Sequence, residues 1–293
     1  MDCSVGVAEA GLMIDVQLHR SIAEFGDIAD HLYGRDPVLF TVELTALKSA
    51  SPSPDNILLS VWDGGQLLGV LLRTPPYAAM VSGLPPLAAP FVAQILAQAG
   101  YELASISGLT ANAVAFADAW RVATAAKTTV EIEEQLYRLG TLHSPAEVIG
   151  KLRAGNRDDI DLLTDWFDQF HVEAFGFASA PDRWRSFLDH LLQSGSLIFL
   201  WTLDGTPVSM AHLHPAVASM SRIGPVFTPT TRRGQGYGSA VTAAAARHAL
   251  SQGGPAQHVV LFADLANPVS NTIYQRLGFE PVAGAIQIAV HPS

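Results

Sequence analysis

The sequence has a single cysteine, Cys3, among its 293 residues. One cysteine excludes an internal disulfide framework and provides no thiolate cluster for a metal, a pattern typical of the reducing cytoplasm. No stretch stays apolar for the roughly 20 residues that a membrane span requires, and the N-terminus lacks the basic start and cleavage site of a signal peptide. We therefore expect a cytoplasmic protein without a membrane partner, and we assign no role to Cys3.

Positive charge is also scarce. There are 17 lysines and arginines against 27 aspartates and glutamates, which gives a formal net charge of −10. Because the phosphates of a nucleic acid require a basic surface, this balance disfavours nucleic acid as a partner and mildly favours an amine-bearing substrate. The 10 histidines follow no metal-binding spacing, such as two on one helical turn with a carboxylate, so we expect no metal site.

The length fits two domains, and the apolar residues predict alternating strands and helices in both halves. In the first half, the expected elements cover residues 12–18, 19–32, 57–62, 67–72, 87–98, 103–106, 111–120 and 129–139. In the second half, they cover residues 158–170, 182–192, 196–203, 208–214, 219–227, 236–251, 258–263, 268–277 and 281–290. The pattern breaks at residues 141–145, which predicts domains 1–144 and 145–293.

The two halves resemble each other in the order of their elements. Each has a hairpin with an Asp-Gly turn, at residues 58–72 and 198–213, followed by helix, strand, helix and strand. This order favours a tandem duplication, although any two α+β domains look alike at this level. In the first half, residues 83–90 contain two adjacent prolines where free amides would be needed, so we expect that half to be a degenerate copy.

A glycine-rich turn, running from Arg232 to Gly238, follows the strand expected at residues 219–227. Glycines let the backbone turn tightly and approach a ligand, and the first amides of the alanine-rich helix that follows have no partner within the helix. The helix dipole adds positive potential, so the turn predicts a site for an anionic cofactor. A dinucleotide-binding fold would need an acidic residue about 20 positions later, and the region near Gln257 has none.

The second half resembles the GNAT superfamily of N-acetyltransferases, which use acetyl-CoA. The family signature of Gln or Arg, two residues, Gly, one residue, and Gly or Ala is met by Arg233, Gly236 and Gly238. The preceding strand ends as it usually does in the family, with a valine, an aromatic residue and a nearby proline. A later signature is met by Asn267, Tyr274, Leu277, Gly278 and Phe279.

The resemblance covers about residues 150–293. It implies an α+β fold, a mixed α/β arrangement of two GNAT-like domains, each with a central mixed, mostly antiparallel sheet flanked by helices. Residues 1–144 would be the degenerate domain and residues 145–293 the acetyl-CoA-binding domain. Such a tandem arrangement is similar to that of the mycothiol synthases, and the alanine-rich composition suits a GC-rich bacterium.

The resemblance also implies how acetyl-CoA is held. Amides of the turn would bind the pyrophosphate, and the pantetheine arm would lie along a strand edge that opens where two strands diverge, for which Gly224 and Pro225 are suited. The cofactor-binding residues would be Val226, Phe227, Thr228, Arg233, Gly234, Gln235, Gly236, Tyr237, Gly238 and Asn267.

The later signature also has a purely structural interpretation. Asn267 and Pro268 form a helix start, and Gly278 is a helix stop. By resemblance, Tyr274 would be the catalytic residue, because a protonated phenol can donate to the sulfur of the departing CoA. Packing against the sheet is the alternative role for this tyrosine.

The sequence does not single out a base for the attacking amine. His212 and His214 share one strand face and titrate near neutrality as free side chains. Asp264 and Glu173 are further candidates, although each also fits a solvated or structural role. For the acceptor site we expect residues 165–185 to contribute, with an aromatic set that also fits a core: Phe167, Phe170, Phe175, Phe177 and Trp184.

The sequence as a whole predicts an acetyl-CoA-dependent N-acetyltransferase that acts on a primary amine of a small molecule or peptide, as a monomer or homodimer and without a metal. One alternative is a transferase that uses another acyl-CoA or a hydroxyl acceptor. Another is a catalytically silent acyl-CoA-binding or scaffold protein. A nucleotide-binding oxidoreductase is the third, and it would require affinity for NAD.

Overall fold

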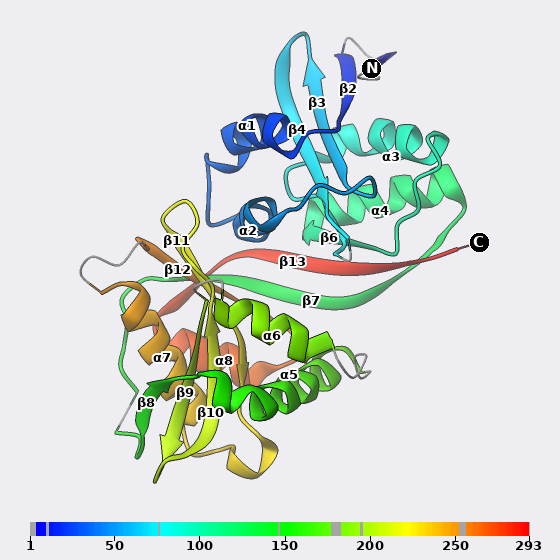
Figure 1. Cartoon of the computed structure of the whole chain (residues 1–293). Helices are drawn as coiled ribbons and strands as arrows, with labels where there is room; N and C mark the ends of the chain where they lie inside the picture. The colour runs from blue at the N-terminus through cyan, green and yellow to red at the C-terminus, as the bar shows by residue number, and fades with distance from the viewer. Residues whose placement is uncertain are drawn as a thin grey trace. The chain divides into compact units, whose positions relative to one another are not determined.

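A computed structural model describes residues 4–9, 12–75, 77–145, 147–176, 183–193, 196–251 and 256–292. The chain forms two compact units (Figure 1). The first unit consists of residues 1–134 and 283–293, and the second of residues 135–282. The predicted boundary after residue 144 lies inside the second unit, and the C-terminal segment belongs to the first. Cys3 lies outside the described residues.

The first unit contains an α/β arrangement built mostly from the N-terminal half. Its helices are α1 (Ile22–Tyr33), α2 (Thr41–Ser49), α3 (Ala89–Gln98) and α4 (Thr110–Thr124). Its strands are β1 (Ser4–Glu9), β2 (Leu12–His19), β3 (Ile57–Asp63), β4 (Gln66–Arg73), β5 (Ala79–Met80) and β6 (Ser105–Leu109). Two long strands, β7 (Lys127–Leu139) and β13 (Phe279–His291), each contribute residues to both units.

The sheet of the first unit has the order β1-β2-β3-β4-β5-β6-β13. Its pairings are antiparallel except for β5 with β6, which is parallel. Helices α3 and α4 cover one face, where the alternate residues of β2 and β3 point into one core. Helix α1 contacts β3 and β4. The C-terminal part of β13 completes this sheet, because its residues 285–289 pair with β6.

The second unit begins with the end of β7. Its strands are β8 (Lys151–Ala154), β9 (Leu197–Leu203), β10 (Thr206–Leu213), β11 (Met220–Phe227) and β12 (His258–Asp264). Its helices are α5 (Ile160–Phe175), α6 (Arg183–Gln193), α7 (Tyr237–Ala249) and α8 (Pro268–Arg276).

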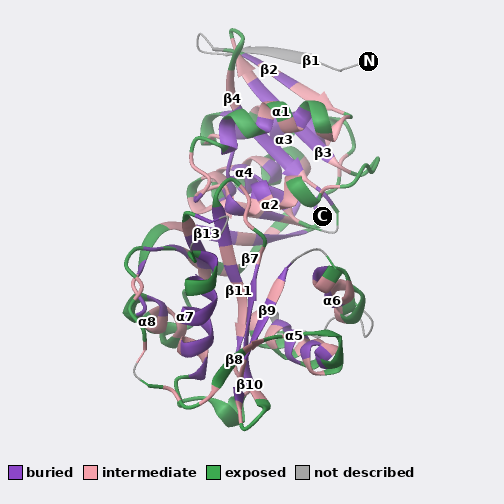
Figure 2. Cartoon of the chain, turned by 60° about the vertical axis from the view of Figure 1, so that its left-hand side comes forward, coloured by how far each residue is buried: buried purple, intermediate pink, exposed green. Residues whose placement is uncertain are grey.

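The sheet of the second unit has the order β7-β12-β11-β10-β9-β8. The pairings from β8 to β11 are antiparallel, and β11 with β12 is parallel. Two apolar cores cover its two faces: α7 and α8 contribute to one, and α5 and α6 to the other. Figure 2 shows these helix pairs on opposite sides of the strands. The alanines of α7 are buried, which lets this helix pack closely on the sheet.

The mixed, mostly antiparallel sheet flanked by helices, predicted for each half, is present in both units. The predicted elements are all found, and the structure adds β1, α2, β5 and β8. Both hairpin turns are two-residue loops with positive φ, at Gly64-Gly65 and Asp204-Gly205. Such φ values match the twist of a hairpin. The second loop has the expected Asp-Gly pair, whereas in the first hairpin Asp63 ends β3 and the loop is Gly-Gly.

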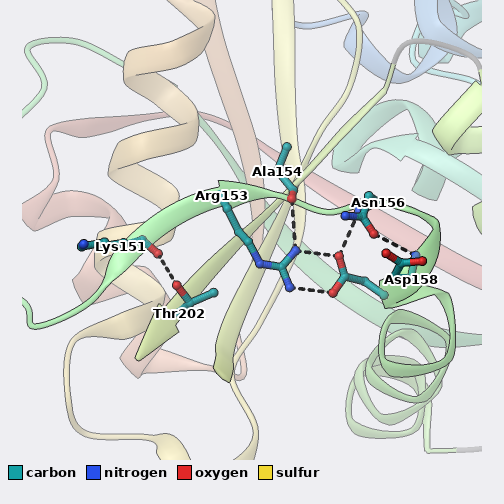
Figure 3. Close-up of polar contacts among 7 residues, drawn as sticks. Lys151, Arg153, Ala154, Asn156, Asp158 and Thr202 are labelled. Atoms are coloured by element: carbon teal, nitrogen blue, oxygen red, sulfur yellow. Dashed lines mark hydrogen bonds and ion pairs between the residues drawn. The ribbon is translucent and has the colours of Figure 1, made fainter. Parts of the chain in front are cut away.

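An ion pair fixes the start of α5 against the edge strand β8 (Figure 3). Arg153 donates to both carboxylate oxygens of Asp159 at 2.6 Å. The same carboxylate accepts from the backbone amide of Asn156, whose side chain in turn accepts from the amide of Asp158. This arrangement is a capping box with an added cation, at a single 3-10 turn, Arg157–Asp159, that leads directly into α5, and it satisfies amides that the start of a helix leaves unpaired.

Candidate active site

The glycine turn has the backbone conformation that its sequence predicts. Arg233 is extended, Gly234 and Gly236 have φ of 77° and 81°, and α7 begins directly after Gly236. Residues other than glycine rarely adopt such φ values, so two of the three glycines are needed for the path of the chain. Gly238 has no such φ, and an added Cβ there would make ordinary van der Waals contact with Thr228 Oγ1, at 3.4 Å.

Within the described residues, most backbone amides of this turn have no hydrogen-bond acceptor; those of Arg232 and Arg233 donate to the carbonyls of Pro229 and Thr230. Among the described residues, none of the amides from residue 234 to residue 239 donates a hydrogen bond to a protein atom. The amide of Ala240 is the first after them that does, to the carbonyl of Gly236. They lie at the N-terminus of a helix of 13 residues, where the dipole favours an anion. The turn can therefore bind a phosphate group through its backbone.

Strand β11 has an open edge just before this turn. Its parallel pairing with β12 covers residues 220–223, and within the described residues it does not extend to residues 224–227. On the other side, β10 pairs with Val226 and Phe227. Gly224 has φ of 150° and a cis peptide bond to Pro225. The end of the β11–β12 pairing at residue 223 corresponds to the strand divergence that the resemblance implied. Such a divergence leaves backbone groups of the strand edge available for an extended ligand.

Side chains around the end of β11 are held by β10 and the adjacent core. Ser209, which sequence analysis did not identify, donates to the carbonyl of Phe227 at 3.0 Å, and its hydroxyl lies 2.8 Å from that of Thr228. Phe227 itself is buried and packs against Trp166, with ring centroids 6.0 Å apart. The side chain of Phe227 therefore belongs to the core and is not available to a ligand at the open edge.

Arg233 connects the turn to α5. Its Nε donates to the carbonyl of Thr228 at 2.9 Å, and one terminal nitrogen donates to both carboxylate oxygens of Glu173, at 2.6 and 2.8 Å. The two charged side chains are 47% and 43% exposed. The structure therefore joins a predicted cofactor residue to a predicted base candidate 60 positions earlier in the chain.

The remaining turn residues pair with each other. Tyr237 is buried, and its hydroxyl donates to Gln235 Oε1 at 2.9 Å. This bond holds the first residue of α7 against the turn, so both side chains serve the shape of the turn. Their backbone amides are among the unpaired donors described above.

Asn267 begins α8, as its structural interpretation predicted. Its side-chain oxygen accepts from the amide of Ser270 at 3.1 Å, and Pro268 occupies the first helical turn. Sequence analysis missed a nearby chain of polar contacts, in which the Tyr137 hydroxyl donates to Asn271 Oδ1 at 2.8 Å and Asn271 Nδ2 donates to the Asp264 carbonyl at 2.7 Å. The bond to Asp264 ties the start of α8 to the end of β12.

Tyr274 lies on α8 and is 9% exposed. Its ring contacts Phe279 edge-on, with centroids 6.1 Å apart. Burial raises the pKa of its hydroxyl to about 12, because the phenolate would lose its hydration. The hydroxyl therefore stays protonated at neutral pH and can act as a hydrogen-bond donor.

The two histidine candidates are adjacent and held neutral. Their ring centroids are 4.1 Å apart, and His214 Nε2 lies 3.0 Å from the Gly224 carbonyl. Burial lowers the pKa of His212 to about 3, and the charge of Arg222 acts in the same direction. The same two causes hold the pKa of His214 well below its ordinary value. Neutral imidazoles of such low basicity accept a proton from an ammonium poorly.

The two acidic candidates have structural partners. Asp264 accepts a hydrogen bond from the amide of Ala266 at 2.7 Å, which shapes the turn before α8. Glu173 is ion-paired with Arg233. The structure thus brings Glu173 to the glycine turn, whereas Asp264 belongs to the start of α8.

The aromatic set predicted for the acceptor site is mainly a core. Phe167 is buried and lies 5.6 Å from Trp184 and 6.1 Å from Phe187, measured between ring centroids. Phe170 packs at the edge of the same core. Phe177 and the side chain of Phe175 lie outside the described residues. Across the part of the chain that the structure describes, there is no group of three metal-ligating side chains and no helix long and apolar enough to cross a membrane.

The chain resembles known proteins in sequence and in structure. A sequence model of the acetyltransferase (GNAT) family matches residues 160–279. A GNAT-family acetyltransferase from Colwellia psychrerythraea has a TM-score of 0.60 and 13% identity, over 94% of this chain and 99% of that one. A GCN5-related N-acetyltransferase from Sphaerobacter thermophilus has a TM-score of 0.62 and 14% identity, over 96% of both chains.

A third solved structure is a tandem GNAT protein from the clavulanic acid biosynthesis pathway, with a TM-score of 0.59 and 14% identity over 96% of this chain and 99% of that one. A comparison with curated proteins found no match. At such identities the solved structures show a shared fold, and the sequence match identifies the domain. Residues 160–279 therefore form a domain of the acetyltransferase (GNAT) family, in a chain that has the fold of tandem GNAT proteins.

Proposed function

We propose that the protein is an acetyl-CoA-dependent N-acetyltransferase that acts on a primary amine of a small molecule or peptide. One observation carries the proposal: the unpaired amides at the start of α7 directly follow the open edge of β11, inside the GNAT domain. A ligand that has a pyrophosphate at one end and amide groups along an extended arm matches both features.

Each part of this site has its own role in the proposal. The turn binds pyrophosphate through backbone amides, aided by the dipole of α7. The strand edge binds the pantetheine arm by backbone hydrogen bonds, and Asn267 lies at the start of the next helix. The proposed cofactor-binding residues are Val226, Phe227, Thr228, Arg233, Gly234, Gln235, Gly236, Tyr237, Gly238 and Asn267.

Bound acetyl-CoA supplies the acetyl thioester. The neutral amine forms a bond to the carbonyl carbon, the carbon–sulfur bond breaks, and the amine proton is lost to the medium. We assign Tyr274 as the group that donates to the departing thiolate, because a phenol is protonated at neutral pH and can give its hydrogen bond and then its proton to the sulfur as the carbon–sulfur bond breaks. Tyr274 can then be reprotonated from solvent, which completes the cycle.

The counterpart of the turn in the first unit supports one site per chain. An added Cβ on Gly69 of β4 would lie 2.5 Å from Pro85 Cδ, so that loop packs directly on the strand. Asn112 donates to the carbonyls of Ser82 and Leu84, at 3.1 and 2.7 Å, and so holds the loop in place. Pro85 and Pro86 have no amide hydrogens to offer a phosphate.

Calorimetric titration with acetyl-CoA tests the proposal. We expect one site per chain, which is lost in Gly236→Asp because the new side chain adds strain and negative charge and meets Val148, 3.1 Å from an added Cβ. The matched control is Gly205→Asp, in the turn between β9 and β10. Gly205 has the same φ of 81° and nothing within 4 Å of an added Cβ, so this variant should keep the site.

Absence of binding by the native chain would refute acetyl-CoA as the ligand. Two sites would mean that the first unit also binds it. Loss of binding in both glycine variants would point to a folding defect rather than to the turn.

The Tyr274→Phe variant separates an enzyme from a silent acyl-CoA-binding protein. We expect kcat to fall by about 100-fold in an amine screen, with acetyl-CoA affinity unchanged, because the lost hydroxyl acts on the leaving group. An unchanged kcat would exclude Tyr274 as the acid. Binding without turnover on any amine would favour the silent protein, and turnover with a hydroxyl acceptor or another acyl-CoA would favour the related transferase.

The sequence supports the setting of this activity. The single cysteine and the acidic balance fit a cytoplasmic enzyme that binds neither nucleic acid nor membrane. We propose that it works as a monomer or homodimer.

A further inference from the structure

The ion pair between Arg233 and Glu173 joins two elements with different proposed tasks. Arg233 belongs to the glycine turn, and Glu173 lies in the last turn of α5. The pairing is specific in geometry: one terminal guanidinium nitrogen contacts both carboxylate oxygens, while Nε is held by the Thr228 carbonyl. Arg233 is the arginine predicted to help the turn bind phosphate. Its guanidinium therefore already forms an ion pair with the carboxylate of Glu173.

A pyrophosphate at the turn would compete for the same guanidinium. Carboxylate and phosphate oxygens both accept charge-assisted hydrogen bonds from a guanidinium. The two partners are 47% and 43% exposed, and ion pairs between groups this exposed are weak and easily exchanged. The carboxylate also opposes an incoming anion through its own negative charge.

We infer that Glu173 is a competitor for Arg233, which the pyrophosphate of CoA displaces when it binds. This inference rests on the proposed function. Displacement transfers Arg233 from the carboxylate to the phosphate and removes the ion pair that ties the end of α5 to the turn. Glu173 therefore lowers the affinity for CoA and couples the occupancy of the turn to α5.

Calorimetric titration with CoA tests this competition directly. We expect Glu173→Gln to bind CoA about threefold more tightly, because the amide keeps the shape of the side chain and removes the competing charge. Arg233→Gln should bind more weakly. In the Arg233→Gln background, Glu173→Gln should have a much smaller effect, because the contested guanidinium is absent.

Two controls isolate the phosphate and the ion pair. Pantetheine, which lacks the pyrophosphate, should show no difference between the native chain and Glu173→Gln. Asp161 forms a similar exposed ion pair, with Arg185, near the other end of α5, at 2.6 Å. The Asp161→Asn variant should therefore bind CoA like the native chain.

The outcomes are distinct. Weaker CoA binding by Glu173→Gln would show that Glu173 positions Arg233 for phosphate, and it would overturn the competition. Unchanged affinity, while the native chain binds CoA, would overturn the inference and leave the proposed function standing. No CoA binding by the native chain would refute the proposed function itself, and the inference with it.

Discussion

At the residue scale, burial decides the chemistry of His212. The side chain is 1% exposed, and its Nε2 has no hydrogen-bond partner among the described residues. Adding a proton there would place a charge in an apolar setting beside the positive charge of Arg222. A residue that usually titrates near neutrality is therefore neutral across the physiological range.

This residue makes the second unit sensitive to acid. Below the ordinary pKa of about 6.5, His212 is protonated in the unfolded chain. In the folded chain it stays neutral until the pH falls to about 3. Stability should therefore fall as the pH decreases between these values, by up to about 1.4 kcal/mol per pH unit for this group. Urea unfolding of the second unit at several pH values measures this slope, which should be smaller in His212→Gln.

The control for this experiment is His31→Gln, an exposed position near the end of α1. Because His31 belongs to the first unit, its replacement should not change the slope measured for the second unit. Equal slopes for the native chain and for His212→Gln would contradict the assignment of a neutral, buried imidazole.

At the element scale, the junction between β8 and α5 depends on one carboxylate. Asp159 is 8% exposed and serves both the ion pair with Arg153 and the capping box. The hydrogen bonds from Arg153, more than its charge, hold the pKa of Asp159 below its usual value. The stability that this carboxylate contributes is thus present above pH about 4 and is lost as the pH falls through the lowered pKa.

Asp159→Asn should therefore destabilise the second unit at neutral pH. The amide keeps the volume, but it loses the charge-assisted bonds and weakens the helix start, which together cost about 1–3 kcal/mol. Denaturant unfolding measures the change. The matched control is Asp118→Asn, in an exposed pair with Arg121, which should cost less than about 0.5 kcal/mol. Similar losses in both variants would contradict the special role of this junction.

At the scale of the whole molecule, the chain returns to the first unit at its C-terminal end. Residues 285–289 pair with β6. Ile286, Ile288 and Val290 lie in the core with α3 and α4. The first unit is therefore built from two segments that are far apart in the sequence, and its sheet is incomplete without the second one.

A fragment of residues 1–144 should therefore lack a cooperative unfolding transition, although those residues correspond to the predicted first domain. In the full chain, Ile288→Ala should destabilise the first unit by about 2–4 kcal/mol, because it leaves a cavity in this core. Gln287→Ala, on the opposite face of the strand, is the matched control and should cost much less. Circular dichroism during urea unfolding measures all three proteins.

Cooperative unfolding of the isolated fragment would contradict this expectation. It would support the domain boundary at residues 144/145, which otherwise stays a prediction.

The sequence alone determined the features that depend on neighbouring residues. Glycines at positions that need positive φ predicted the turn before α7, and paired turn residues predicted both hairpins. Asn267 and Pro268 predicted the start of α8. In these cases the conformational preferences of a few adjacent residues decide the structure, so a short stretch of sequence contains the necessary information.

Tertiary structure alone decided the features that join distant segments. The sequence could not show that Glu173 meets Arg233, that β13 completes the first sheet, or that His212 is neutral. It also missed β5 and β8, because strands of two and four residues are too short to show alternation. Strand pairing, burial and ion pairing depend on which surfaces meet after folding, and no local pattern of residue types specifies that.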